Sequence, residues 1–416
     1  MNPSGREAPS PHTPPLHTVQ AWSPHDTVVD NDTVRPTDRP VEEAHGLATR
    51  LVHAGETWQP HNAVTTPVFD TASFIMPDLA THDAAVASMS AGPYYTRGYN
   101  PTVDALERKL AAVEMAEAAL AFNNGMAAIT TTLLALLRDG WHVVASDELF
   151  VATHRWLAED LAGLGGQCTF ANFDDLETVA RAIRPNTRAL FFEEFTNPKL
   201  RVLDLTSLIE LGHDRGLVVV VDNTLASPVL LQPLGHGADL VLHSATKYLA
   251  GHGRVLAGAV AGRKSLLAPI RELCRRLGTA ATPHNAAGVL DGMKTLQLRM
   301  QRQSASALHL ANLARAHPAT SEVYYPGLPG GHGHRVATLL TGGIYGGMFS
   351  FTLSEPNRKA AVYDAFEVIT RATSLGDVAS LVDSYESPDL LRISVGIEEP
   401  RDLAADLTHA LDRALG

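Results

Sequence analysis

The sequence predicts an α/β protein whose mainly parallel β-sheet is flanked by helices and followed by a smaller α+β domain. Strand-like and helix-like segments alternate between about residues 100 and 250, which is typical of βαβ units. The strand predicted at 217–223 is apolar at consecutive positions, as expected of a strand buried on both faces of a sheet. From about residue 300, longer helices and alternating strands replace this pattern, which indicates the smaller domain.

The individual elements follow from apolar periodicity and from start and stop signals. Asn-Gly opens one predicted helix and Asp-Gly closes it. Helices are expected at 102–115, 123–140, 151–165, 175–183, 205–216 and 303–317. Strands are expected at 118–122, 142–147, 168–173, 188–195, 217–223, 345–353 and 390–396, and 239–249 is expected to be a strand followed by a turn.

Four segments are predicted along the chain. Residues 1–44 hold eight of the 25 prolines among polar residues. Such a segment cannot offset its ordering entropy by burying apolar surface, so we expect a flexible tail, or else a segment that docks on a partner subunit. Residues 45–99 are expected to form an ordered but irregular arm, 100–298 the larger domain and 299–416 the smaller domain.

The composition excludes several classes of function. The net charge of −12 argues against binding to nucleic acid or to anionic membranes, which favour basic surfaces. No apolar run reaches the roughly 18 residues that a membrane span needs. The two cysteines, Cys168 and Cys274, form neither a disulfide framework nor a metal-binding spacing. We therefore expect a cytoplasmic protein with reduced thiols and no metal site, and no secretory signal is apparent.

Polar residues follow three of the predicted parallel strands. Asn197 follows 188–195, Asp222 ends an apolar strand, and the segment 243–247 follows the next one. Ligands of open parallel sheets bind beyond the carboxyl ends of the strands. The topology therefore predicts that these residues lie around one ligand site.

Lys247 has two readings. A lysine at the end of a buried strand is usually a snorkelling or ion-paired residue. It can also be a Schiff-base lysine, whose amine must be kept neutral by burial or by neighbouring cations. Two neighbouring hydroxyls, those of Ser244 and Thr246, are suited to phosphate oxygens, and a buried Asp222 needs a cationic partner such as a pyridinium nitrogen.

A second anion site is indicated at the start of the helix predicted at 123–140. Gly125 and Met126 begin this helix after a strand, where free N–H groups and the helix dipole favour an anion. Many helices start with Asn-Gly for structural reasons alone, so this signal by itself is weak.

These residues belong to a set of motifs that occur in order along 45–416: YYTRGYNPT, NNGMAAI, FFEEFTNP, VVDNTLASPVLLQPLGHGADLVLHSATKYLAGHG, SLGD and LLRISVG. With them the chain resembles the Cys/Met-metabolism enzymes that use pyridoxal 5′-phosphate (PLP), the group of cystathionine γ-synthase, cystathionine γ-lyase, methionine γ-lyase and homoserine sulfhydrylases. The resemblance implies the type I PLP-dependent transferase fold, as in aspartate aminotransferase. It also implies PLP as cofactor, and a homotetramer built as a dimer of dimers that share active sites.

The resemblance assigns roles to the cofactor-binding residues. Lys247 would carry PLP as a Schiff base and move the substrate's α-proton, while Asp222 would hold the pyridinium nitrogen. The phosphate would be bound by Gly125, Met126, Ser244 and Thr246. In this reading 100–298 is the PLP-binding domain.

Further residues are assigned across the subunit interface and to the substrate. Tyr95 and Arg97 would reach the phosphate of the neighbouring subunit, and the arm 45–99 would contact that subunit. Asn197 would lie near the cofactor's phenolic oxygen and the substrate carboxylate. Arg392 would clamp this carboxylate with Ser374 nearby, unless it is a surface arginine on an edge strand.

The chain departs from the family at Phe150, where relatives have a tyrosine. The resemblance implies that this tyrosine stacks on the cofactor ring and delivers a proton to the leaving group. Phe150 can stack on the ring, but it has no hydroxyl and cannot act as an acid. Such an acid typically contributes about 10²–10⁴-fold to a rate. The substitution therefore favours another acid or a leaving group that needs no proton.

Other departures concern the substrate side. Thr373 stands where cystathionine γ-lyases have a glutamate, and Ala152 stands where methionine γ-lyases have a cysteine. The path from SLGD to LLRISVG is short and lacks a Met-Thr-His element. Arg254 replaces an acidic residue, either near the site or facing solvent.

The expected function is a PLP-dependent lyase that eliminates a γ- or β-substituent from an α-amino acid, with a good leaving group as in a halogenated or unsaturated amino acid. The alternatives are γ-replacement on an O-acylated homoserine, cystathionine or methionine γ-lyase activity, and a protein without catalysis that serves as a scaffold. The lysine, aspartate and arginine argue against the scaffold.

Overall fold

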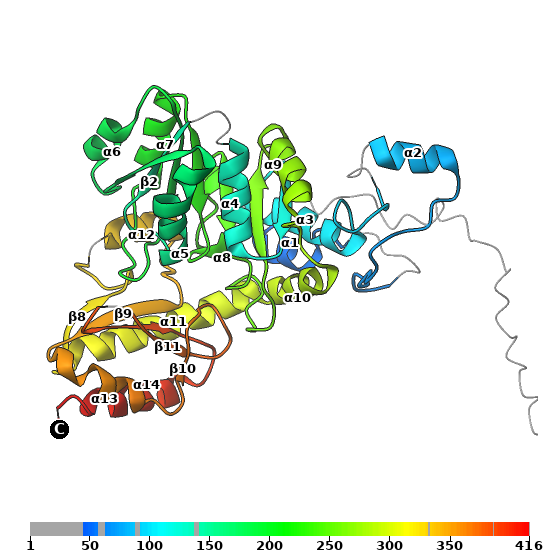
Figure 1. Ribbon diagram of the computed structural model, residues 1–416. Coiled ribbons are helices and arrows are strands. Elements are labelled where there is room, and N and C mark those ends of the chain that lie inside the picture. Colours follow the sequence, from blue (N-terminus) through cyan, green and yellow to red (C-terminus); the bar gives the residue numbers. More distant parts are fainter. Residues whose placement is uncertain are drawn as a thin grey trace, which may run out of the picture. The chain divides into compact units, whose positions relative to one another are not determined.

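The computed structural model describes residues 45–56, 63–87, 92–136, 141–331, 333–385 and 387–415 (Figure 1). The tail predicted at 1–44 lies outside the described residues. In the described part of the chain, no helix combines the length and the apolar character needed to cross a membrane.

The first sheet has seven strands in the order β1-β7-β6-β5-β4-β2-β3. Strands β2 to β6 run parallel to one another, and β7 pairs antiparallel with both β1 and β6. The sequence-based prediction of a mainly parallel sheet is confirmed. The strands are β1 (Ala118–Phe122), β2 (His142–Ser146), β3 (Gln167–Ala171), β4 (Thr187–Glu193), β5 (Val218–Asp222), β6 (Leu240–His243) and β7 (Gly258–Gly262).

Helices cover both faces of this sheet. Because successive strand residues point to opposite faces, each buried strand contributes to two cores. Leu190 and Phe192 pack with helices α3, α7 and α10, whereas Phe191 packs in a second core with α4 and α9. The helices are α3 (Pro101–Glu114), α4 (Gly125–Leu136), α5 (Val151–Arg155), α6 (Leu176–Ala182), α7 (Leu205–Asp214), α8 (Ser227–Leu230), α9 (Lys264–Leu277) and α10 (Pro283–Lys294). The helix predicted at 151–165 is instead α5 followed by a π turn (Trp156–Asp160) and a 3₁₀ turn (Leu161–Leu164), and another 3₁₀ turn is Pro233–His236.

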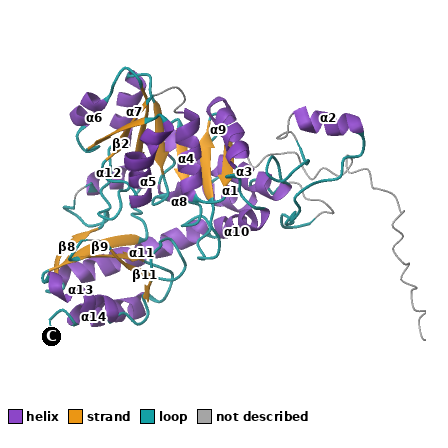
Figure 2. Ribbon diagram, in the orientation of Figure 1, coloured by secondary structure: helices purple, strands orange, loops and turns teal. Residues whose placement is uncertain are grey.

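A second sheet of five strands, in the order β10-β11-β12-β9-β8, forms the C-terminal region (Figure 2). Its strands are β8 (Thr320–Tyr324), β9 (Met348–Leu353), β10 (Thr370–Arg371), β11 (Leu381–Ser384) and β12 (Leu390–Ser394). Its helices are α11 (Leu296–Ala316), α12 (His334–Thr341), α13 (Lys359–Asp364) and α14 (Pro400–Asp412), with a 3₁₀ turn at Pro356–Arg358. Helices α11 and α14 pack with this sheet in a core of their own.

The N-terminal arm contains α1 (Leu47–His53) and α2 (Leu79–Ala87). A buried lysine fixes α1 to the rest of the protein. The ammonium group of Lys109, on α3, donates to the carbonyls of Leu51 and Val52 and to Glu56 Oε1 at 2.7 Å. Lys294 lies 3.3 Å from the other oxygen of Glu56. The side chains of Lys109 and Glu56 are 0% and 7% exposed, so this ion pair is buried.

We expect Lys109→Met to lower the free energy of unfolding by about 3 kcal/mol, since it removes the buried ammonium group that donates to Glu56 Oε1 and to two carbonyls. Arg108→Ala is the matched control on the same helix: its exposed pair with Asp104 is worth at most about 0.5 kcal/mol. Urea unfolding of both variants measures the difference, and equal midpoints would contradict the importance of this buried cluster.

Candidate active site

The carboxyl ends of β4, β5 and β6 open onto a cavity of about 690 Å³. Asn197, Asp222 and Lys247 line it, as the topology predicts, and residues of the C-terminal region close the other side. Of the predicted site residues, the cavity holds Gly125, Met126, Phe150, Asn197, Asp222, Ser244, Thr246, Lys247, Ser374 and Arg392. Pockets of about 300–1,000 Å³ are typical of small-molecule and cofactor sites.

Two carboxylates lie at the ends of neighbouring strands. Glu193 and Asp222 are register partners in β4 and β5, and both are buried. Burial, and then the charge of Asp222, holds the pKa of Glu193 well above its usual range. Burial also raises the pKa of Asp222, against the hydrogen bonds of Thr224 and the charge of His243. A cation at this place would let Asp222 stay ionised.

The partners of Asp222 leave one of its oxygens available. Thr224 donates to Oδ1 through its backbone N–H, at 3.0 Å, and through its hydroxyl, at 2.5 Å. Among the described residues, no group hydrogen-bonds to the other oxygen. The Thr224 hydroxyl also accepts from the N–H of Ser244 at 2.7 Å, so one threonine connects the Asp222 end of the site to the turn that carries Lys247.

The first turn of α4 provides an anion site. The side chain of Asn124 accepts from the N–H of Ala127 at 2.8 Å. Within the described structure, the N–H groups of Gly125 and Met126 donate to no protein acceptor. Ser244 packs against Gly125 so closely that a Cβ atom there would lie 2.8 Å from the serine hydroxyl. Unpaired N–H groups at a helix start beside a hydroxyl form a cradle for a phosphate.

Thr246 also lines the cavity, and its part in phosphate binding stays a prediction. Its hydroxyl donates to the carbonyl of Ala257 at 3.1 Å and accepts from the N–H of the same residue at 2.9 Å. The hydroxyl proton is therefore used in a hydrogen bond within the connection between β6 and β7. The oxygen can still accept one more hydrogen bond. Thr246 thus fixes the backbone that carries Lys247.

The amine of Lys247 is placed by a residue from the C-terminal region. Its Nζ donates to Ser374 Oγ at 2.9 Å. Burial, and then the charge of Arg392, lowers the pKa of Lys247, which favours the neutral, nucleophilic amine. Ser374 has φ 124°, a backbone conformation that a residue with a side chain rarely adopts. Strained conformations of this kind cluster at functional sites.

Arg392 is 3% exposed and lies on β12, a central strand, so it is not a surface arginine. Its Nη1 donates to Asn197 Oδ1 at 3.0 Å and to the hydroxyl of Tyr385. Its Nη2 donates to the carbonyl of Ser374 at 2.9 Å and to Asp383 Oδ2 at 3.0 Å. A buried guanidinium at the wall of a cavity is suited to binding a carboxylate.

Phe150 brings an aromatic ring to the same cavity. It lines the cavity with 44% of its surface exposed, and its backbone N–H donates to Glu193 Oε1 at 2.5 Å. The ring is therefore available to stack on a ligand. Arg254 also lines the cavity, at an exposed position.

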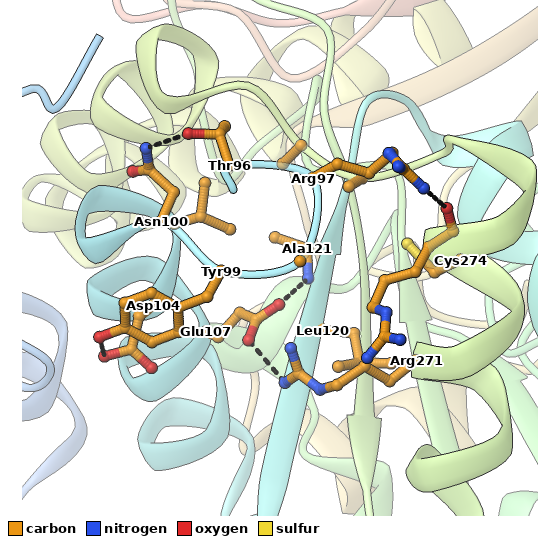
Figure 3. Close-up of a pocket in the computed structure, with 15 residues that line it drawn as sticks. Thr96, Arg97, Tyr99, Asn100, Asp104, Glu107, Leu120, Ala121, Arg271 and Cys274 are labelled. Carbon is orange, nitrogen blue, oxygen red and sulfur yellow. Dashed lines mark hydrogen bonds and ion pairs between the residues drawn. The ribbon is translucent and has the colours of Figure 1, made fainter. Parts of the chain in front are cut away.

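Tyr95 and Arg97 do not line the Lys247 cavity. The Arg97 guanidinium lies 5.6 Å from the Tyr95 ring centroid and donates to the carbonyl of Arg275 at 2.7 Å. Figure 3 shows Arg97 beside a smaller cavity, near the pair of Glu107 and Arg271. Within one chain, these two residues are thus separate from the site, and their role at a neighbouring subunit stays a prediction.

Sequence reasoning missed four residues of this site: Glu193, Thr224, Asp383 and Tyr385. Adjacent residues of a strand point to opposite faces, so the sequence Glu193-Glu194 does not indicate a pair of carboxylates. The pairing of Glu193 with Asp222 comes from the register of β4 with β5. Tyr385 lies in the short path from SLGD to LLRISVG, directly after β11, and its contact with Arg392 depends on how β11 and β12 are connected.

The donor set fits PLP. The cradle at α4 suits a phosphate, and the available oxygen of Asp222 suits a pyridinium nitrogen. The Lys247 amine suits an aldehyde, and the exposed Phe150 ring suits an aromatic face. With the sheet topology, these features define a PLP-dependent enzyme of the type I fold.

Comparisons with known proteins identify the family. The family of Cys/Met metabolism PLP-dependent enzymes matches residues 48–412. L-methionine γ-lyase of Pseudomonas putida is 37% identical over 88% of this chain and 97% of its own length. Cystathionine γ-synthase of Mycobacterium tuberculosis is 41% identical, with the same shares covered. The protein therefore belongs to the Cys/Met-metabolism family of PLP-dependent enzymes.

A solved structure gives the same result. A structure from Campylobacter jejuni, assigned as an O-acetylhomoserine (thiol)-lyase, superposes with a TM-score of 0.85 at 28% identity, covering 88% of this chain and all of the other. That structure carries a pyridoxyl-lysine phosphate group. PLP as cofactor and the type I fold are thus shown, and the relatives indicate lyase or synthase chemistry on sulfur-containing amino acids and their precursors.

We expect Gly125→Ala to weaken PLP binding about tenfold or more, because its Cβ would lie 2.7 Å from the Cβ of Ser244 and displace the phosphate cradle. Gly163→Ala, at a site with open space around it, is the control. Titration of the apoprotein with PLP, followed by visible absorbance, measures both affinities. Unchanged affinity in Gly125→Ala would show that the phosphate binds elsewhere.

Proposed function

We propose that the enzyme eliminates a γ- or β-substituent from an α-amino acid whose leaving group departs without a proton from the protein. The observation that carries the proposal is Phe150, a ring at the cavity wall with no hydroxyl. Leaving groups of this kind are halide, carboxylate, phosphate and a neutral thioether released from a sulfonium. A halogenated or unsaturated amino acid is the substrate class that we favour.

The residues of the site have distinct tasks in this proposal. Bound PLP supplies an electron sink that stabilises negative charge at the substrate carbons. Lys247 takes the α-proton and, in γ-chemistry, moves a proton at the β-carbon. Ser374 orients the amine, as its 2.9 Å hydrogen bond supports. Asp222 holds the pyridinium nitrogen, and Arg392 with Asn197 binds the substrate carboxylate.

A second candidate is γ-replacement on an O-acylated homoserine. The 41% identity to a cystathionine γ-synthase and the likeness to a structure assigned as an O-acetylhomoserine (thiol)-lyase favour it. Its leaving group is a carboxylate, which also needs no protein acid, so Phe150 is compatible with both candidates. The two reactions differ after the leaving group has departed. Elimination releases a keto acid and ammonia, whereas replacement adds a thiol to the carbon chain.

We further propose that the active form is a homo-oligomer, a dimer of dimers in the cytoplasm, in which Tyr95 and Arg97 serve the partner's phosphate site. The arm supports this, since the apolar side chains of Val64 and Ile75 are 95% and 94% exposed in the single chain. We keep 100–298 as the PLP-binding domain and 299–416 as the C-terminal domain. Their separate sheets support this division.

Product analysis tests the proposal. The purified holoenzyme is incubated with halogenated, unsaturated, O-acylated and thioether amino acids, with and without an added thiol, and products are identified by mass. Elimination predicts a keto acid and ammonia whether or not the thiol is present. A thioether product that forms only with the thiol would favour replacement, and thioether amino acids as the best substrates would contradict the proposed leaving-group class.

We expect Phe150→Tyr to retain turnover of good-leaving-group substrates within a few-fold, because their departure needs no acid. The same variant is expected to accelerate thioether elimination, by at most about 10²–10⁴-fold. Phe150→Leu is the control for loss of the ring rather than gain of a hydroxyl. Steady-state kcat on a halogenated and on a thioether amino acid measures both effects, and loss of turnover on the preferred substrate in Phe150→Tyr would overturn the proposal.

A further inference from the structure

The two edges of the Arg392 guanidinium have different partners. The Nη2 edge already faces a charge, the carboxylate of Asp383, together with the carbonyl of Ser374. The Nη1 edge faces only neutral acceptors, Asn197 Oδ1 and the hydroxyl of Tyr385. A carboxylate accepts a hydrogen bond from a guanidinium more strongly than a neutral oxygen does. An incoming carboxylate therefore gains more at the Nη1 edge than at the Nη2 edge.

The Tyr385 hydroxyl has a defined direction at this edge. Since Arg392 Nη1 can only donate, the phenol oxygen accepts from it, and the phenol proton is donated to Asn197 Oδ1 at 2.8 Å. The guanidinium carbon lies 5.0 Å from the centroid of the Tyr385 ring. Burial raises the pKa of Tyr385, so the hydroxyl keeps its proton at neutral pH. The proton is available to another acceptor if one replaces Asn197.

Hydrogen bonds to its backbone hold Tyr385 beside Arg392. The ammonium of Lys359, on α13, donates to the carbonyl of Tyr385 at 2.7 Å and to that of Ser387 at 2.6 Å. Strand β11 ends at Ser384 and β12 begins at Leu390, so the connection is short and Tyr385 directly follows β11. Both features keep the phenol at the wall of the cavity, which it lines with Arg392 and Asn197.

We propose that Tyr385 is a specificity-determining residue whose hydroxyl, together with Asn197 and the Nη1 edge of Arg392, binds the α-carboxylate of the substrate. This inference rests on the proposed function for its amino-acid substrate, and it assigns a residue to the carboxylate end of that site. On binding, the carboxylate accepts the phenol proton in a hydrogen bond in place of Asn197 Oδ1. Tyr385 contacts Arg392 and Asn197, the two residues assigned to the carboxylate, so the phenol lies at that end of the site.

Binding of amino acids that carry no leaving group tests the proposal. L-alanine and L-alaninamide are titrated into the holoenzyme, and the visible absorbance of the bound cofactor gives each Kd. In Tyr385→Phe, which keeps the ring over Arg392, we expect the Kd of alanine to rise about 10- to 100-fold, the effect of losing a hydrogen bond to a charged group. The Kd of alaninamide is expected to change less than about threefold, because the amide has no negative charge.

Tyr345→Phe is the matched control. Its hydroxyl contacts Thr338 at 3.0 Å and lies outside the residues that line the cavity, so neither Kd should change. Lys359→Met keeps the phenol but frees the backbone of Tyr385, and we expect it to weaken alanine binding in the same direction by a smaller factor.

Three results would overturn the assignment. Equal weakening of alanine and alaninamide in Tyr385→Phe would mean a structural role only. Unchanged binding of alanine would mean that the phenol does not contact the carboxylate. Unchanged binding with a lower kcat and an altered pH profile would make Tyr385 a proton donor instead. Because no turnover is needed for the binding measurement, a wrong leaving group in the proposed function would leave this test intact.

Discussion

The buried amine of Lys247 is the constraint on which the rest of the site depends. To react with an aldehyde, this amine must lose its proton and keep a fixed direction, and the two needs are met by different parts of the chain. Burial and the nearby charge of Arg392 lower its pKa. Ser374, about 130 residues further along, fixes its direction through one hydrogen bond. The C-terminal region is therefore needed for chemistry that begins at the edge of the first sheet.

The same burial raises a problem for the acidic residues of the site. Glu193 and Asp222 end adjacent strands, and both carboxyls are favoured in the neutral form without a cation between them. At Asp222, the hydrogen bonds of Thr224 and the charge of His243 lower the pKa and so oppose the effect of burial. His243 is itself buried, with its Nε2 atom 2.6 Å from Glu114 Oε1. Asp222 thus has more support for its charge than Glu193 has. This difference accounts for why a pyridinium nitrogen fits beside Asp222.

Much of this arrangement could be predicted from the sequence, because it depends on local patterns. Buried strands, a helix start at Gly125 and a polar turn around Lys247 each have a signature within a few residues. The pairing of Glu193 with Asp222, and the contact of Tyr385 with Arg392, depend on strand register and on the exact length of a connection. No local pattern encodes these. The helix predicted at 151–165 is broken after Arg155, although its apolar spacing is helical throughout.

Reduction of the holoenzyme with borohydride, followed by peptide mapping by mass, tests the central role of Lys247 most directly. We predict that the pyridoxyl group is fixed on the peptide that contains Lys247, and that Lys247→Ala protein acquires none. A pyridoxyl group on another lysine, such as Lys294 or the buried Lys109, would contradict it. So would a holoenzyme whose colour is unchanged by the reductant.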